Sequence, residues 1–149
     1  MQDYFGEPTE IQTFRGRWLE LPPENRCRLG ESPETGTLGS TAIAGARVWD
    51  SQLTFRVRLG PMGLKDFSRF LPGSPSLARL QSWLAHYVGA EYFWDLQVLL
   101  TAADVPATVL ASGRAPQLGR LGWTTWLKSK SAERDSDDLV LNPLGAMNR

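Results

Sequence analysis

The clearest pattern of apolar and polar positions lies between Leu53 and Leu59. Every odd position there is apolar and every even one is polar, in the order Leu-Thr-Phe-Arg-Val-Arg-Leu. A period of two predicts a β-strand with its apolar side toward a core, and with Arg56 and Arg58 toward water or a partner. Gly60–Pro61 predicts the end of this strand, because proline cannot donate to the ladder and glycine weakens a strand.

Two segments after this strand have helical spacing. Apolar residues in Gly63–Leu71 predict a short helix that Pro72–Gly73 ends. For a second helix over 75–88, Ser74 can cap the free N–H groups and Pro75 suits the first position. Gly89 suits the left-handed position after its end. The apolar stripe of this helix consists of Leu77, Leu80, Leu84, Tyr87 and Val88.

Shorter patterns predict further strands. Glu91–Thr101 is aromatic and β-branched, and one of its faces would carry Tyr92, Trp94, Leu96, Val98 and Leu100. Weaker patterns favour strands at Thr13–Leu21, Thr108–Ala111, Leu121–Leu127 and Leu139–Leu141. Residues 22–45 and 113–138 are interpreted as mainly loop, and loops of this length commonly carry binding segments. We expect Leu80, Leu84, Phe55, Val57 and Leu96 to be buried.

These elements predict an α+β fold with short mixed or antiparallel strands packed on two central helices. A length of 149 residues suits one domain, so residues 1–149 are expected to form a single unit. Within it, residues 1–10 are interpreted as a loose N-terminal segment. Residues 128–138 are charged and Ser-rich, and are interpreted as a flexible loop.

The charge balance changes the choice of function class. Lys and Arg total 16, as do Asp and Glu, so the formal net charge is zero. A nucleic-acid-binding protein usually has a basic excess, so no nucleic-acid partner is expected. Zero net charge favours association, which indicates a protein that works within a complex. Cys27 is the single cysteine, which excludes an intrachain disulfide and fits a reducing compartment.

Nothing in the sequence indicates export or membrane insertion. The start, MQDYFGEPTEIQ, is acidic and lacks the charged and then apolar pattern of a signal peptide. No apolar run approaches the ~20 residues needed to cross a bilayer. We therefore expect a soluble protein that is not exported and does not insert directly into a membrane.

The residues for catalysis or metal binding are sparse. His86 is the only histidine, and although Ser82 one turn earlier could reach it, no nucleophile motif surrounds that serine. One histidine and one cysteine cannot form a usual zinc site. Asp135, Asp137 and Asp138 lack the glycine and glutamate of a calcium-binding loop. We expect no catalytic residues, no metal and no cofactor.

One enzymatic alternative stays open at this stage. Arg56 and Arg58 share a strand face, and together with Asp50 or Asp95 they could form a site for a small anion or a sugar. Such a site requires converging polar groups in a deep pocket. Ion pairing of these arginines with neighbouring acids is the simpler interpretation.

Several separate motifs resemble one protein family, and they occur in its order along the chain. The motifs are Leu38–Gly39, Gly45–Gln52 (GARVWDSQ), Phe55–Pro61 (FRVRLGP), Phe70–Gly73 (FLPG), Leu84–Gly89, Trp94–Leu96, Leu121–Leu127 (LGWTTWL) and the acidic segment Asp135–Val140. Together they are similar to the TssG family of type VI secretion baseplate subunits, above all to its C-terminal part. Members of that family are longer, so the chain is expected to correspond to a part of them.

The resemblance implies a structural role and no bond chemistry. TssG-like proteins assemble with TssF-like proteins in baseplate wedges and dock the TssK-like adaptor, which links the baseplate to the membrane complex. The implied location is therefore the bacterial cytoplasm, at a membrane-docked baseplate of a contractile injection machine.

A separate hypothesis concerns which residues contact partners, and it rests on residue type. Tryptophan and arginine are enriched at binding hot spots, and the chain has six tryptophans. Trp123, Trp126 and Leu127 are the first candidates, and the 28–45 arm is an alternative to them. Arg56 and Arg58 are the second.

Overall fold

The computed structural model spans the whole chain and describes residues 1–28, 36–37, 39–40, 42–89, 91–108, 120, 122–128 and 130–142. The chain divides into two compact units. Unit 1 consists of Met1–Thr13 and Phe55–Arg149, and unit 2 of Phe14–Thr54. One domain over residues 1–149 stays a prediction. The contacts within the chain form two groups, one in each unit.

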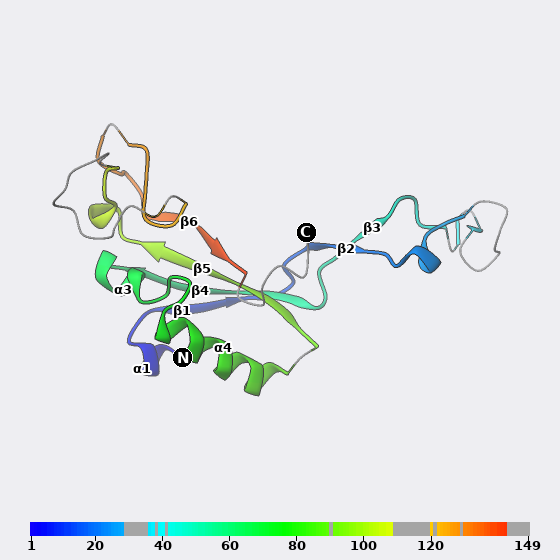
Figure 1. The fold of residues 1–149 in the computed structure, drawn as a ribbon, viewed down its shortest axis with the longest axis horizontal. Coiled ribbons are helices and arrows are strands. Elements are labelled where there is room, and N and C mark those ends of the chain that lie inside the picture. The colour runs from blue at the N-terminus through cyan, green and yellow to red at the C-terminus, as the bar shows by residue number, and fades with distance from the viewer. Residues whose placement is uncertain are drawn as a thin grey trace. The chain divides into compact units, whose positions relative to one another are not determined.

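Unit 1 is built on a four-stranded sheet in the order β1-β4-β5-β6 (Figure 1). Its elements in chain order are α1 (Gln2–Phe5), β1 (Thr9–Gln12), β4 (Thr54–Met62), α3 (Leu64–Ser68), α4 (Pro75–Val88), β5 (Phe93–Leu100), η2 (Ala102–Asp104) and β6 (Ser136–Leu141). The strand β1 is antiparallel to β4, and β6 is antiparallel to β5. The predicted α+β class with mixed strands is confirmed.

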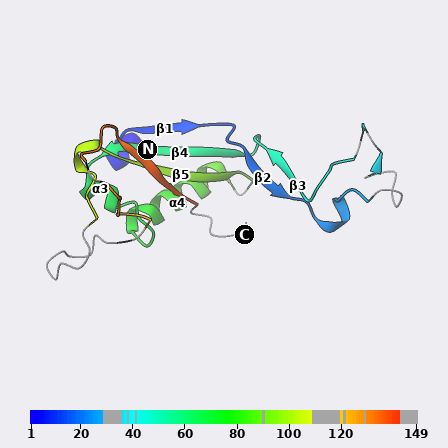
Figure 2. The same cartoon turned by 90° about the horizontal axis from the view of Figure 1, so that it is seen from above.

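The central strands β4 and β5 run side by side in the same direction (Figures 1 and 2). Contacts between them keep a constant offset of 39 residues, since Arg56 reaches Asp95 and the Met62 carbonyl accepts from Thr101. A constant offset is the signature of parallel neighbours. Parallel strands need a long crossover connection, and α4 lies within it.

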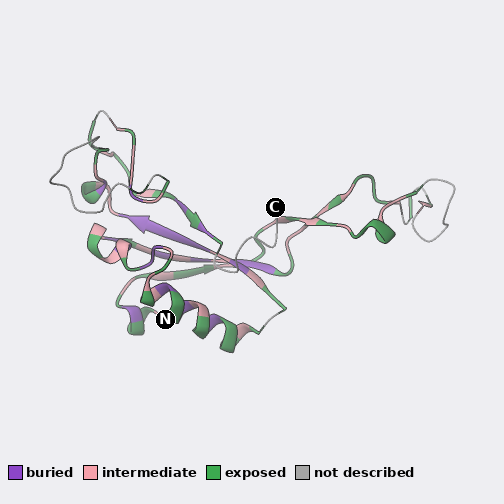
Figure 3. Cartoon of the chain, in the orientation of Figure 1, coloured by how far each residue is buried: buried purple, intermediate pink, exposed green. Residues whose placement is uncertain are grey.

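The core lies on one face of this sheet (Figure 3). Val57, Leu59, Leu96, Val98 and Leu80 are completely buried in one cluster. All five residues predicted to be buried are buried, with Phe55 and Leu84 joining the cluster. Because strand side chains alternate, the opposite face carries the polar residues between them.

The end predicted for the central strand is wrong. The strand β4 continues through Gly60–Pro61 to Met62. The N–H of Gly60 donates to the Pro8 carbonyl, and the carbonyl of Met62 accepts from the N–H of Thr101, so the proline removes only one donor from the ladder. Leu53, placed on the core face by the alternation, lies before the strand and is exposed.

The second helix matches its prediction closely. It spans Pro75–Val88, and the Ser74 hydroxyl accepts from the N–H of Leu77 as an N-cap. Its stripe is only partly correct, because Leu77, Leu80 and Leu84 are buried whereas Tyr87 is 90% exposed. Gly89 has the expected positive φ, but its ψ of −173° is extended rather than left-handed helical.

The first ten residues are more ordered than their polarity indicates. They form α1 and begin β1, and Phe5 is buried against Phe70 with ring centroids 5.6 Å apart. Residues 1–10 are interpreted as loose from the sequence, whereas one aromatic anchor and two ladder positions, Thr9 and Glu10, hold this segment in the structure. In the same way, Ser136–Asp138 at the end of the predicted loop 128–138 belong to β6.

The weaker strand predictions had mixed outcomes. Tyr92 is half-exposed before β5, whose inward residues follow the predicted alternation. In the predicted Leu121–Leu127 strand, Leu121 lies outside the described residues, and residues 122–127 contain a turn and an isolated bridge between Ala107 and Trp126 rather than a strand. The last strand is longer than Leu139–Leu141 and begins at Ser136. Residues 109–111 of the predicted Thr108–Ala111 strand lie outside the described residues.

Unit 2 contains a two-stranded antiparallel ribbon. The ribbon consists of β2 (Arg17–Glu20) and β3 (Arg47–Asp50). The short η1 helix (Pro23–Asn25) lies between these strands in the chain. Strand β2 falls within the predicted Thr13–Leu21 strand, whereas β3 was not predicted. Among the described residues of unit 2, Thr54 at its end is the only buried one.

Candidate protein interface

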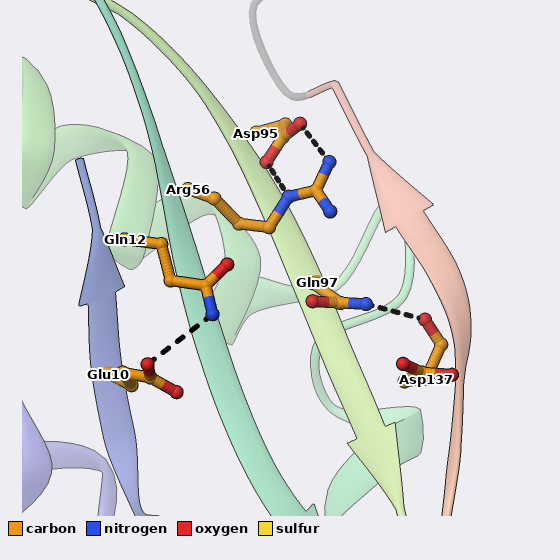
Figure 4. A network of polar contacts seen from close by, with 6 residues as sticks. All are labelled: Glu10, Gln12, Arg56, Asp95, Gln97 and Asp137. Carbon is orange, nitrogen blue, oxygen red and sulfur yellow. Dashed lines mark hydrogen bonds and ion pairs between the residues drawn. The ribbon is translucent and has the colours of Figure 1, made fainter. Parts of the chain in front are cut away.

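The polar face of the unit 1 sheet is organised by an ion pair between its two central strands (Figure 4). The Nε and Nη2 atoms of Arg56 donate to the two carboxylate oxygens of Asp95 over 2.6 and 2.7 Å. This two-pronged geometry is the strongest form of a carboxylate–guanidinium contact. The hydrogen bond to Asp95, with the attraction of its charge, raises the pKa of Arg56 against the opposing effect of burial.

The outer strands join the same polar face. Arg58 donates to Glu10 on β1 over 2.8 Å, and Gln12 donates to the same carboxylate group. On the other side, the Gln97 amide donates to the Asp137 carbonyl of β6 over 2.7 Å (Figure 4). These contacts cross all four strands, so the polar face stabilises the order of the sheet.

The pairing of the arginines matches the simpler interpretation of their strand face, which is ion pairing with neighbouring acids. Arg56 is held by Asp95 and Arg58 by Glu10, so each guanidinium already has a carboxylate partner. Asp50 belongs to unit 2, where it lies opposite Arg17 in the β2–β3 register. Arg56 and Arg58 thus act first as cross-strand ties, and a role in partner binding stays a prediction.

Trp126 and Trp123 are both partly buried against the unit 1 core. The ring of Trp126 meets Phe67 edge to face at 5.9 Å, and its Nε1 donates to the Ser136 hydroxyl over 2.9 Å. Trp123 lies under the guanidinium of Arg120, 5.4 Å from the ring centroid. The anchoring of these rings explains why a tryptophan-rich segment is not simply a free surface loop.

Leu127 is the exposed member of the predicted set. It is fully exposed beside the anchored Trp126, and it cannot be explained by core packing. A single exposed leucine is common on protein surfaces. Because Leu127 directly follows the half-buried Trp126, it is the clearest probe of a contact surface in unit 1.

The largest exposed aromatic group in unit 2 was missed by sequence reasoning. Trp18 of β2 and Trp49 of β3 lie opposite each other in the register, with ring centroids 5.3 Å apart in an edge-to-face pair. They are 59% and 57% exposed, and Phe14 before β2 is 73% exposed. The signal was hidden because the two tryptophans are 31 positions apart in the chain (49 − 18) and become neighbours only through strand pairing.

The backbone around this pair is fitted to it. A Cβ at Gly16 would lie 1.9 Å from a ring atom of Trp49, so only glycine permits the indole to lie against the chain there. Burial lowers the pKa of Arg17, against the attraction of Asp50 across the ribbon. We name the surface made of Trp18 and Trp49 the aromatic ribbon patch.

The remaining chemical candidates do not come together. His86 is exposed on α4, while the Ser82 hydroxyl donates to the Ala78 carbonyl one turn earlier. Cys27 is half-buried in unit 2. Within the described ranges, no group of three or more His, Cys, Asp or Glu residues could hold a metal ion. No helix in the part of the chain that the structure describes is long and apolar enough to cross a membrane.

Comparison with known proteins places the chain in a family. The family described as "Type VI secretion, TssG" matches residues 1–128. The chain belongs to the TssG family of type VI secretion. A search of the curated proteins finds no match.

Two solved structures share the fold. A chain of the TssK-TssF-TssG baseplate subcomplex of the type VI secretion system, solved by cryo-electron microscopy, is 21% identical with a TM-score of 0.62, over 88% of this chain and 53% of that one. A chain of "the baseplate complex from the type VI secretion system" is 19% identical with a TM-score of 0.53, over 91% of this chain and 37% of that one. This TssG-family chain therefore spans about half the length, or less, of the solved chains that it matches.

Proposed function

We propose that this TssG-family chain is a structural subunit of a type VI secretion baseplate wedge, which assembles with a TssF-like protein and docks a TssK-like adaptor. It performs no bond chemistry and works in the bacterial cytoplasm, at a baseplate docked to the membrane. The family match supports this function, as do the solved relatives, whose subcomplex contains TssK and TssF.

The observation that carries the proposal is the aromatic ribbon patch. A two-stranded ribbon is only marginally stable by itself in water. This one leaves two tryptophans more than half exposed, although each could bury a large apolar area against another surface. Aromatic anchors of this kind are typical of the centres of protein interfaces. The ribbon is therefore built to be covered by a partner.

Co-purification tests the proposal directly. The tagged chain is co-expressed with the TssF-like and TssK-like proteins of the same bacterium, and both partners are expected to remain bound after size-exclusion chromatography. The double variant Trp18→Thr and Trp49→Thr keeps residues that favour strands while removing the aromatic area. It is expected to lose at least one partner.

The matched control is Tyr87→Ala, which removes an exposed aromatic ring from α4 in unit 1. It is expected to bind like the unaltered chain. Equal binding by the tryptophan double variant, with an unchanged circular dichroism spectrum, would place the interface elsewhere. Failure of the unaltered chain to retain either partner would contradict the assembly role for this chain.

The predicted contact residues of unit 1 need separate probes, because they differ in their packing. Leu127→Ser changes only an exposed side chain, so a loss of binding would report a contact. Trp126→Ala and Trp123→Ala also remove core packing, and are informative only when the urea midpoint is measured alongside. Arg56→Lys and Arg58→Lys keep the charge but lose the forked geometry, which separates partner steering from cross-strand pairing.

A further inference from the structure

Unit 1 has a groove beside the start of β6 that the proposed function does not use. Its volume is about 660 Å³, which is in the size range of ligand pockets. Its apolar lining comes from Val105, Trp126, Leu127 and Ala132. The half-buried indole of Trp126 and the exposed side chain of Leu127 can therefore contact a ligand in the groove.

The rim of the groove has a strong charge bias. Four carboxylates line it, from Glu133, Asp135, Asp137 and Asp138, against two cations, from Lys128 and Arg134. The net charge of the lining is therefore −2 (2 − 4), in a chain whose formal net charge is zero.

The chain itself holds part of this rim in place. The Asp135 carboxylate accepts from the N–H of Ala102, and the Asp138 carboxylate accepts from the Ser136 hydroxyl. The same Ser136 hydroxyl accepts from the Trp126 indole, so the rim and the apolar floor are tied together. The Lys128 ammonium donates to the Val105 carbonyl, which holds this cation at the groove wall.

All four carboxylates on the rim belong to exposed residues, and those of Asp135 and Asp138 accept hydrogen bonds within the chain. Glu133 and Asp137 are both exposed, and the Asp137 backbone is fixed by the Gln97 amide. A fixed backbone reduces the entropy lost when a carboxylate on it pairs with a cation. The indole of Trp126 adds a surface on which a guanidinium can stack.

We propose that this groove docks an extended, arginine-bearing segment of a partner protein in the baseplate, with apolar residues of that segment on Trp126 and Leu127. The charge bias selects a basic partner, and the apolar floor selects a peptide over a simple cation. The inference rests on the proposed function, because the partner is taken from the same assembly. It adds a second contact, in unit 1, to the aromatic ribbon patch of unit 2.

The test uses the full chain and a defined probe. The probe is a fluorescein-labelled peptide, acetyl-Ala-Leu-Arg-Leu-Arg-Ala-amide, and its binding is measured by fluorescence anisotropy at low and high salt. The double variant Glu133→Gln and Asp137→Asn is expected to weaken binding by at least about fivefold, since two charge pairs are lost. Leu127→Ser is expected to weaken it as well, at both salt concentrations.

The matched control is Asp3→Asn with Glu91→Gln, which removes the same charge from two exposed positions outside the groove. It is expected to bind the peptide like the unaltered chain. The inference is overturned if this control weakens binding equally, if a peptide with glutamate in place of arginine binds as well, or if the peptide does not bind.

Co-purification with the TssF-like and TssK-like proteins separates the two proposals. Retention of both partners by the unaltered chain, without peptide binding, rejects the groove and keeps the proposed function. Peptide binding that depends on Glu133 and Asp137, without retention of either partner, keeps the groove as a basic-peptide site and rejects the assembly role.

Discussion

At the scale of single residues, backbone geometry and local charge determine which residue type a position requires. Gly60 has a φ of +107°, and a Cβ there would lie 2.5 Å from the Leu99 carbonyl of β5. Glycine is therefore required where the parallel strands β4 and β5 approach each other. The polar face is equally specific, because the side chains of Arg56 and Asp95 meet in only one register of these strands.

Glu7 leads to a prediction on pH dependence. Burial and the nearby Asp66 carboxylate raise the pKa of Glu7, and the charge of Arg69 opposes this effect. A carboxyl with a raised folded-state pKa contributes stability below its unfolded pKa and loses it as the pH rises through the folded pKa.

Glu7→Gln is therefore expected to raise the free energy of unfolding at pH 7, by about 0.5 kcal/mol or less because solvent screens this partly exposed carboxylate, and to change it little at pH 3. Urea unfolding at both pH values measures the difference. A gain at pH 3 that disappears at pH 7 would reverse the sign and contradict the assignment.

At the scale of elements, α4 shows that helical spacing predicts a helix but not every side chain that the helix buries. Its leucines enter the core, and Ser74 caps its first turn. Trp83 and Tyr87 have spacings that place them on or beside the same stripe, yet both are exposed, and Trp83 packs on Tyr4 of α1 with centroids 4.7 Å apart. The hydrophobic stripe thus predicts the helix correctly, but its width is set by the sheet beneath it.

Leu84→Ala is expected to lower the free energy of unfolding by roughly 2–5 kcal/mol, because Leu84 is 2% exposed and its removal leaves a cavity. Tyr87→Ala, on the same helix, is expected to change it by about 0.5 kcal/mol or less, since that ring is in water. Chemical denaturation of both variants compares a buried and an exposed position of the same stripe on α4. A loss under ~0.5 kcal/mol for Leu84→Ala would show that the leucine stripe does not form the core.

At the scale of the whole molecule, unit 2 is an insertion between two paired strands. The strand β1 ends at Gln12, which lies opposite Arg56 in β4, and unit 2 occupies the chain between these strands. The cluster of buried hydrophobic residues includes Phe5 and members from Phe55 to Leu141, all of which belong to unit 1. Unit 1 therefore contains the described core by itself.

Replacement of Phe14–Thr54 by a short Gly-Asn turn is expected to leave unit 1 folded, because paired strands need only a tight connection. Its urea transition is expected to stay cooperative, while co-purification with the partner that covers the aromatic ribbon patch is lost. Circular dichroism and urea unfolding measure the first outcome, and size-exclusion chromatography measures the second. Loss of the cooperative transition would show that unit 2 is required for the fold of unit 1.

The sequence by itself determined the features that depend on local pattern. The helix Pro75–Val88 with its cap, the inward faces of β4 and β5, and the family resemblance could all be predicted from residues close together in the chain. The physical reason is that periodicity and caps act over a few positions, where backbone geometry decides which side chains share a face.

Only the tertiary structure decided which distant residues meet. The Arg56–Asp95 pair, the Trp18–Trp49 pair and the contact of Trp126 with Ser136 join residues through strand pairing or packing. Strand β3 and the extension of β4 past Pro61 likewise depend on partners in the ladder rather than on propensity. A pattern along the chain sets what each face can bury, whereas the register between strands determines which groups become neighbours.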